Sequence, residues 1–268
     1  MSLIELRDVT KAFYANREKD KATIAVDHVD LAVEEGEFVS LIGPSGCGKT
    51  VTLSLMAGFA SPTMGEVLCC GAPIAGPGPD RGVVFQEYSL LPWLTVEDNI
   101  VFAVKNSCRA RKVRFDKSDA HRRAAEALAA VGLPDAGGSR PNTLSGGMKQ
   151  RVAIARLLAM DSEVFLMDEP FSALDEQTRS ILDKSLFDLW KDRQKTIVFV
   201  THNITEAVLV SSRIVLFSGP PGRIARQWML PKDLERDLSS PEIQRVCDEI
   251  RIELARGSSA FGEQERDA

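Results

Sequence analysis

The 268-residue sequence contains no apolar run approaching the ~20 residues that a membrane-spanning helix requires. Its start, Met-Ser-Leu-Ile-Glu-Leu-Arg-Asp, also lacks the basic lead and apolar core of a secretion signal. We therefore expect a chain that is made and stays in the cytosol, so that any membrane association comes through a partner protein.

Cysteine and histidine are scarce, with five and three residues respectively. No C-x-x-C pattern or Cys/His spacing typical of a zinc site is present. Cys69 and Cys70 are adjacent, which is a poor geometry for a disulfide between them. We expect most of the cysteines to be small buried residues in a reducing compartment. Cys47, by contrast, is expected to be open to oxidation or alkylation.

The chain also lacks an excess of positive charge. Its formal net charge is −5 and its pI is about 5.4, so it has no general attraction for a polyphosphate backbone. Nucleic acid is therefore not an expected partner. Local basic stretches exist, such as residues 109–114, and we interpret them as solvated helix or loop faces.

One glycine-rich segment carries the strongest signal. Residues 43–50 read Gly-Pro-Ser-Gly-Cys-Gly-Lys-Thr, the G-x-x-x-x-G-K-[ST] pattern of a phosphate-binding loop. Its backbone N–H groups can surround an anion, Lys49 can reach the β- and γ-phosphates of a nucleotide, and Thr50 can bind Mg²⁺. An apolar run at 37–42 predicts a buried strand before the loop, and residues 50–57 predict a helix that ends at Gly58.

The remaining chain alternates apolar runs and helical patterns. Strands are expected at 3–7, 25–33, 65–68, 83–85, 164–167, 196–200 and, as the last strand, 213–217, with a turn at 16–21. Helices are expected at 118–131, capped by Ser118, at 176–191, and in the tail from Pro241 to before Gly257. This order predicts an α/β fold with a mainly parallel, helix-covered sheet.

Two further segments carry chemistry. Asp168 and Glu169 follow an apolar strand, where Asp168 can hold Mg²⁺ and Glu169 can activate the water that attacks a γ-phosphate. Leu144-Ser-Gly-Gly-Met-Lys-Gln-Arg151 predicts a helix that starts with Ser145 near its cap. Its free N–H groups and positive dipole end offer a second anion site.

Residues 144–150 resemble the signature sequence of ATP-binding cassette (ABC) proteins. Gln86 resembles the Q-loop glutamine of this family, residues 172–175 resemble its D-loop, and His202 resembles its switch histidine. The resemblance covers residues 3 to about 225. It implies a P-loop NTPase (RecA-like) core at about 1–86 and 161–230, with an antiparallel β subdomain, an inserted helical subdomain at about 87–160, and a C-terminal tail at 231–268.

The resemblance implies a magnesium-dependent ATPase. The implied catalytic residues are Glu169, His202 and Gln86, and the implied Mg²⁺ ligands are Thr50, Gln86 and Asp168. The implied ATP-binding residues are Phe13, Gly43, Pro44, Ser45, Gly46, Cys47, Gly48, Lys49, Thr50, Val51, Ser145, Gly146, Gly147 and Asp175.

Two of these roles have alternatives. Phe13 stands where the family places the aromatic residue that stacks on adenine, but it could be a core residue, and Tyr14 is a second candidate for stacking. Asp175 could cap the following helix, face a partner subunit, or do both. The sequence departs from the family pattern at Met148, where glutamine is commoner, and at Val51, where a second hydroxyl is frequent. Neither departure is expected to abolish function.

The family architecture implies a head-to-tail dimer in which each ATP lies between one phosphate loop and the signature segment of the second ABC ATPase subunit. The aromatic and apolar residues at 87–99, including Trp93, form either a packed subdomain core or the groove for a cytoplasmic helix of a membrane permease. Residues 76–86, Leu-Pro-Trp93, Met148 and Pro-Gly-Arg223 resemble ATPases of nitrate/sulfonate/taurine-type importers.

We therefore expect the energy-coupling ATPase of an ABC importer, acting as a homodimer at the cytoplasmic face of the inner membrane. A periplasmic or extracellular solute-binding protein would be an indirect partner. A soluble ABC ATPase acting on DNA or ribosomes, a non-hydrolysing nucleotide sensor and an exporter are the alternatives. The motifs identify neither the solute nor the permease.

Overall fold

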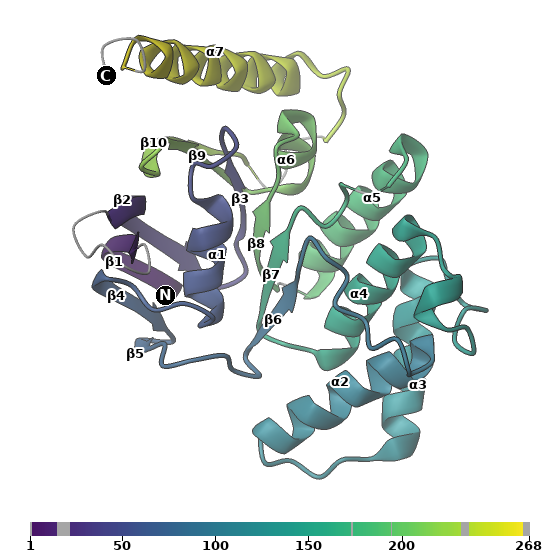
Figure 1. The fold of residues 1–268 in the computed structure, drawn as a ribbon. Helices are drawn as coiled ribbons and strands as arrows, with labels where there is room; N and C mark the ends of the chain where they lie inside the picture. The colour runs from purple at the N-terminus through teal and green to yellow at the C-terminus, as the bar shows by residue number, and fades with distance from the viewer. Residues whose placement is uncertain (1, 15–21, 173, 194, 232–235, 265–268) are drawn as a thin grey trace. The chain divides into compact units, whose positions relative to one another are not determined.

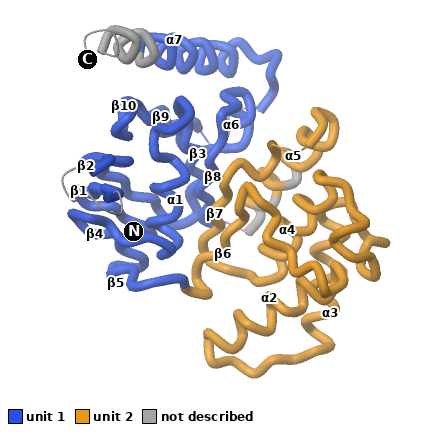
Figure 2. Tube along the Cα trace, in the orientation of Figure 1, with its two compact units in different colours: residues 1–77, 193–268 blue, residues 78–192 orange. Residues whose placement is uncertain are grey.

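The computed structural model describes residues 2–14, 22–172, 174–193, 195–231 and 236–264 (Figure 1). The turn expected at 16–21 lies outside these residues. The chain divides into two compact units, one of residues 1–77 and 193–268 and one of residues 78–192 (Figure 2). No helix in the described ranges is both long and apolar enough to cross a bilayer.

The first unit contains an antiparallel sheet. Strand β1 (Ser2–Tyr14) pairs with β2 (Ala22–Glu34) and β4 (Met64–Cys69), and β5 (Ala72–Pro73) pairs with β4. β1 and β2 are longer than the sequence predicted. The reason is a pair of irregularities at Asp8 and His28, whose φ angles of 49° and 48° shift the register and interrupt the alternation of apolar residues.

The same unit contains a buried parallel ladder. Strand β3 (Phe38–Ile42) pairs on one side with β8 (Thr196–Val200) and on the other with β9 (Arg213–Ser218). All residues of β3 and β8 are buried, as expected for strands inside a covered parallel sheet. β9 is not the last strand, because β10 (Arg223–Met229) follows and pairs antiparallel with it. β10 is largely exposed and polar, so it has no apolar run to predict it.

In its described residues this unit has three helices. Helix α1 (Lys49–Ala57) ends at Gly58, whose φ of 78° is left-handed, as predicted. Helix α6 (Ile204–Val210) follows β8, and α7 (Pro241–Gln264) packs against α6 and β9. The predicted end of α7 before Gly257 is wrong, because the helix continues to Gln264 and a glycine weakens a helix by only about 1 kcal/mol.

The second unit holds a parallel pair of strands and a group of helices. Strand β6 (Arg81–Val84) pairs with β7 (Val164–Asp168). Helices α2 (Val96–Ala110), α3 (Lys117–Ala130) and α4 (Gly146–Met160) pack on one another, and α4 also contacts β6. A short 3-10 turn (Pro141–Thr143) precedes α4, and α5 (Glu176–Arg193) follows β7. The helical region expected at 87–160 lies within this unit.

The N-terminal cap of α3 differs from the prediction. Asp116, and not Ser118, is the capping residue, and its carboxylate accepts hydrogen bonds from the N–H groups of Ser118 at 2.7 Å and Asp119 at 3.1 Å. A carboxylate at this position also interacts favourably with the positive end of the helix dipole. The helix therefore starts before Ser118.

Candidate nucleotide-binding site

The glycine-rich loop lies between β3 and α1, in the order that its sequence predicted. Gly43 has a φ of 149°, and a β-carbon there would stand 2.5 Å from the carbonyl oxygen of Phe217. Gly48 has a φ of 86°, and a β-carbon there would stand 2.4 Å from Cγ1 of Val26. Only glycine allows both the left-handed backbone and these close approaches, so the two positions set the curl of the loop.

The ammonium group of Lys49 lies inside this curl. It is buried and donates hydrogen bonds to the carbonyl oxygens of Gly43 at 2.8 Å and Pro44 at 2.9 Å. Its remaining contact is the sulfur of Cys47 at 3.5 Å, so in the described part of the chain its partners are neutral. A buried cation without a carboxylate favours binding of an anion. The loop therefore fits a nucleotide phosphate.

The other residues of the loop differ in exposure. Ser45, Gly46 and Thr50 are exposed, and Val51 is half-buried in the first turn of α1. Cys47 is completely buried, and a β-carbon on Gly219 would stand 3.2 Å from its own β-carbon. The expectation that the Cys47 thiol is open to oxidation or alkylation is therefore wrong, because close backbone packing encloses it.

His202 lies on the turn that follows β8. Because β3 and β8 are adjacent and parallel, with Leu41 opposite Val200, the phosphate loop and His202 leave the same edge of the sheet. Two contacts hold the turn: Thr201 Oγ1 donates to the buried carboxylate of Glu206 and also accepts the N–H of Asn203 at 3.0 Å.

The acidic pair and Gln86 come from the second unit. Asp168 ends β7 and is buried, and Glu169 follows with a φ of 46°. A left-handed conformation at a non-glycine residue stores strain that is common at functional sites. Gln86 is exposed and follows β6, whose Val84 is opposite Met167 of β7. The three polar residues therefore lie at the same edge of the β6–β7 pair.

The signature segment begins α4. Ser145 is the N-cap, and its Oγ accepts the N–H of Met148 at 3.3 Å, which confirms the predicted helix start. Gly146 approaches Tyr88, since a β-carbon on Gly146 would stand 2.9 Å from the Tyr88 hydroxyl. The ammonium of Lys149 lies 6.0 Å from the centre of the Tyr88 ring. Sequence reasoning did not identify this contact of Tyr88 with the signature helix.

Asp175 caps α5, as one of its two readings predicted. Its carboxylate accepts the backbone N–H of Thr178 at 2.9 Å and the hydroxyl of the same residue at 2.8 Å, and these bonds lower its pKa. Phe13, near the end of β1, is 49% exposed, so it is not a core aromatic residue. Tyr14 is exposed as well, so both rings remain candidates for stacking on a base.

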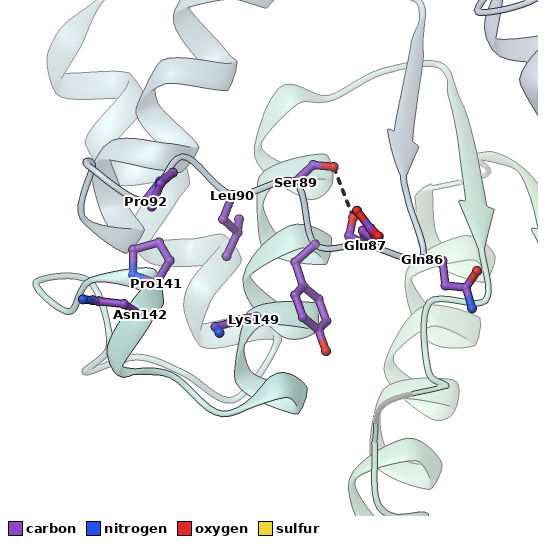
Figure 3. A pocket seen from close by; sticks show the side chains of 9 residues that line it. Gln86, Glu87, Ser89, Leu90, Pro92, Pro141, Asn142 and Lys149 are labelled. Carbon is purple, nitrogen blue, oxygen red and sulfur yellow. Dashed lines mark hydrogen bonds between the residues drawn. The ribbon is translucent and has the colours of Figure 1, made fainter.

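A groove of about 580 Å³ is lined mainly by the segment that begins at Gln86. Figure 3 shows Gln86 at one end of the groove and Pro92 at the other. Trp93, just beyond the groove, is 67% exposed, whereas Val96 and Ile100 are buried. The first part of the segment 87–99 is therefore exposed surface, and its later part, from Val96, packs into the core. The groove is lined by Gln86, Glu87, Tyr88, Ser89, Leu90, Pro92, Pro141, Asn142 and Lys149.

The residues expected to bind a metal fit Mg²⁺ by their chemistry. Thr50, Gln86 and Asp168 supply a hydroxyl, an amide oxygen and one carboxylate, all of them hard oxygen donors. The described residues contain no group of three or more His, Cys, Asp or Glu side chains that could hold a metal by themselves. Mg²⁺ typically binds through one or two carboxylates together with the phosphates of a substrate.

A phosphate loop after a buried parallel strand, an acidic pair at the end of another strand and a helix led by two glycines define a P-loop nucleoside triphosphatase. The chain belongs to the ABC transporter family, whose pattern matches residues 26–172. It is therefore an ATP-binding cassette ATPase.

Some of the similar proteins are named as import ATP-binding proteins. The nitrate import ATP-binding protein NrtD of Synechococcus elongatus is 45% identical over 80% of this chain and 77% of its own length. The taurine import ATP-binding protein TauB of Sinorhizobium fredii is 42% identical over 92% of this chain and 94% of its own. A dimeric structure of the cassette MJ0796 bound to ADP and Pi has a TM-score of 0.76 and is 33% identical, covering 85% of this chain and 99% of that one.

Proposed function

We propose that this protein is the ATP-hydrolysing, energy-coupling subunit of an ABC importer of the nitrate/sulfonate/taurine type. The observation that carries the proposal is its similarity to import ATP-binding proteins over almost the whole chain, with 42% identity over 92% of its length in the case of TauB. The exposed groove beside Gln86 offers a surface for a membrane partner. The solute is not assigned.

The phosphate loop binds the nucleotide in this proposal. Lys49 binds the β- and γ-phosphates, and the backbone N–H groups of the loop surround them. Phe13 or Tyr14 stacks on the adenine. The residues assigned to phosphate binding are Gly43, Pro44, Ser45, Gly46, Cys47, Gly48, Lys49, Thr50 and Val51.

Hydrolysis is assigned to the polar residues at the strand ends. Glu169 accepts a proton from water as its oxygen attacks the γ-phosphorus, and the bond from that phosphorus to the β–γ bridging oxygen breaks. His202 donates a hydrogen bond to the γ-phosphate. Thr50, Gln86 and Asp168 would hold Mg²⁺, which neutralises the charge on the phosphate oxygens.

Two cassettes act together in this proposal. Ser145, Gly146 and Gly147 bind the γ-phosphate of the nucleotide on the second subunit through the N-terminus of α4. Asp175 caps α5 and faces the second subunit. The dimeric cassette with ADP and Pi among the similar structures supports this arrangement. ATP then favours the dimer and hydrolysis releases it, which is a two-state device.

The groove at residues 86–92 receives a cytoplasmic helix of the permease, and the exposed Trp93 next in the chain also contacts that partner. The protein would then be a peripheral protein at the cytoplasmic face of the inner membrane. A solute-binding protein outside the cell would be an indirect partner. Apolar and aromatic residues in a groove are suited to the apolar face of a helix.

The variant Glu169→Gln tests the dimer and the partner. It should bind Mg·ATP, form a dimer by light scattering, and co-purify from gently solubilised membranes with a multi-spanning permease identified by mass spectrometry. Glu163→Gln, an exposed change just before β7, is the matched control and should hydrolyse ATP and return to monomers.

Three results would contradict the proposal in different ways. A Glu169→Gln chain that stays monomeric in saturating Mg·ATP argues against the homodimer. Capture of only soluble proteins or nucleic acid, with wild-type hydrolysis intact, favours a soluble ABC ATPase. Absence of magnesium-dependent phosphate release from the wild type indicates a nucleotide sensor.

A further inference from the structure

Cys69 and Cys70 form a thiol pair that lies outside every element assigned to nucleotide or permease. Their sulfur atoms are 4.0 Å apart. Cys69 is buried and Cys70 is exposed, and neither is in a disulfide. One cysteine of the pair is therefore enclosed by the protein, and the other is exposed to solvent.

The turn after β4 is what brings the two sulfurs together. In a strand, successive side chains point to opposite faces, so adjacent cysteines would hold their sulfurs apart. Here Cys70 has a φ of 52° and Gly71 a φ of 76°, and these left-handed residues close the hairpin in which Cys69 pairs with Ala72. Glycine and asparagine are the usual residues at such positions, and another L-residue there is disfavoured by about 1–2 kcal/mol.

Backbone hydrogen bonds hold this turn on the sheet. The N–H of Cys70 donates to the carbonyl oxygen of Leu3 at 2.8 Å, and Cys69 lies opposite Ile4 in the β1–β4 ladder. The turn tip is open, because no atom lies within 4 Å of the place where a β-carbon on Gly71 would be. The pair is therefore pre-organised, and it meets solvent at the exposed Cys70.

The spacing of the sulfurs suits a bridging atom better than a disulfide. A disulfide requires sulfurs about 2.05 Å apart and α-carbons at least about 4.4 Å apart, whereas adjacent α-carbons are about 3.8 Å apart. Two sulfurs bound to one atom at about 2.3 Å lie about 3.3–3.8 Å from each other for bond angles of about 90–110°, a range that includes pyramidal trivalent arsenic. The 4.0 Å separation of the sulfurs is slightly above that range, so a small side-chain rotation would bring them to it.

The number of ligands selects the kind of bridging atom. Structural zinc takes four protein ligands, and the described residues hold no group of three or more His, Cys, Asp or Glu side chains able to bind a metal. Trivalent arsenic is soft, prefers sulfur, and needs only two protein thiols because its third bond is to its own substituent. We propose that Cys69 and Cys70 form a dithiol binding site for trivalent arsenicals.

The reaction is balanced without an oxidant. With phenylarsine oxide, both S–H bonds break, two arsenic–sulfur bonds form, and the arsenic-bound oxygen leaves as water with the two protons. Arsenic remains trivalent and the phenyl group stays on it. The proposal does not depend on the importer function.

The test is intact-mass analysis of the full-length, reduced protein with phenylarsine oxide. The wild type should take up one phenylarsenic group that survives excess 2-mercaptoethanol and is removed by 2,3-dimercaptopropanol. Cys70→Gly should bind at least about 100-fold more weakly, because the second sulfur no longer acts at a high effective concentration. Glycine also suits the left-handed backbone at position 70, so this variant should stay folded.

Two controls make the result specific. Cys108→Ser removes a half-buried thiol in α2 and should keep the adduct, whereas Cys69→Ser should lose it as Cys70→Gly does. A monothiol-resistant adduct that persists in Cys70→Gly would overturn the proposal. So would a wild-type adduct that 2-mercaptoethanol removes.

Discussion

Arg156 in the signature helix holds the backbone of Ser89 in the segment that lines the groove. Its Nη1 donates a hydrogen bond to the carbonyl oxygen of Ser89 at 2.6 Å. Burial lowers the pKa of the guanidinium. Because Ser89 has a φ of 46°, the segment turns sharply where the hydrogen bond is made. The groove and the signature helix are therefore joined by a hydrogen bond from a charged donor.

Removing this contact should destabilise the protein. Arg156→Met keeps much of the apolar volume but removes the hydrogen bond to Ser89, and we expect a loss of about 1.5–3 kcal/mol in the free energy of unfolding. Arg122→Met is the control, because the ion pairs of Arg122 with Asp119 and Glu126 are exposed and should contribute less than about 1 kcal/mol. Urea unfolding followed by circular dichroism measures both. Equal losses of unfolding free energy in the two variants would show that the Arg156 hydrogen bond contributes no more than the exposed ion pairs of Arg122.

Lys49 should be essential for nucleotide binding but not for folding. Lys49→Met removes a buried cation that, among the described residues, donates hydrogen bonds to loop carbonyl oxygens and the sulfur of Cys47. We expect the affinity for ATP to fall at least about 100-fold, since the ammonium is a charge-assisted donor to phosphate. Titration calorimetry measures the change, with Lys105→Met on exposed α2 surface as the charge-matched control. An affinity within about threefold of the wild type would contradict the assignment.

The local signals in the sequence were sufficient for the phosphate-loop unit. The apolar run before Gly43 predicted β3, and the glycine at position 58 predicted the end of α1, since each depends on residues close in sequence. The family resemblance then implied the fold, which the cassette structures confirm with a TM-score of 0.76 and 33% identity. The roles of individual site residues remain predictions.

Long-range contacts were out of reach of the sequence. Cys47 was expected to be reactive, but its burial depends on Gly219, far along the chain. The turn that carries His202 is held by the hydrogen bond between Thr201 and Glu206. These two residues come together because helix α6 begins directly after this turn. In the sequence, the available signal for this contact was a glutamate in the first turn of the helix after β8. That signal is weak without the fold, because the sequence does not show that the glutamate is buried.

Asp175 should make stability depend on pH. Two donors from Thr178 lower its pKa below the usual 3.8, so the folded protein favours the carboxylate. Its contribution is complete above the unfolded pKa and is lost as the pH falls through the lower, folded pKa. The difference in urea midpoint between wild type and Asp175→Ala should therefore shrink as the pH is lowered below about 4.

Asparagine provides the control for this titration. Asp175→Asn keeps a side-chain oxygen that can cap α5 but cannot lose a proton. Its midpoint relative to Asp175→Ala should not change across the same pH range. If the wild type and Asp175→Asn show the same pH dependence, the carboxylate of Asp175 is not the titrating group.

The tail helix should contribute to stability through one face only. Ile243 and Ile250 are completely buried in a cluster with Leu216 and Trp228, while Ile252 is 53% exposed. Ile243→Ala or Ile250→Ala removes buried methyl and methylene groups and leaves a cavity, so we expect a loss of about 2–5 kcal/mol. Ile252→Ala changes the same residue type in the same helix and should alter stability by less than about 0.5 kcal/mol.

The comparison separates two roles for the tail. If α7 packs on α6 and β9 in solution, the two buried variants lower the urea midpoint and increase hydrogen exchange in α7, and Ile252→Ala does neither. If the tail instead served mainly as a contact with another subunit, the buried variants would leave the isolated chain unchanged. The second result would show that α7 does not pack in the core as the structure describes. Replacing either buried isoleucine of a packed cluster should change the stability of the chain.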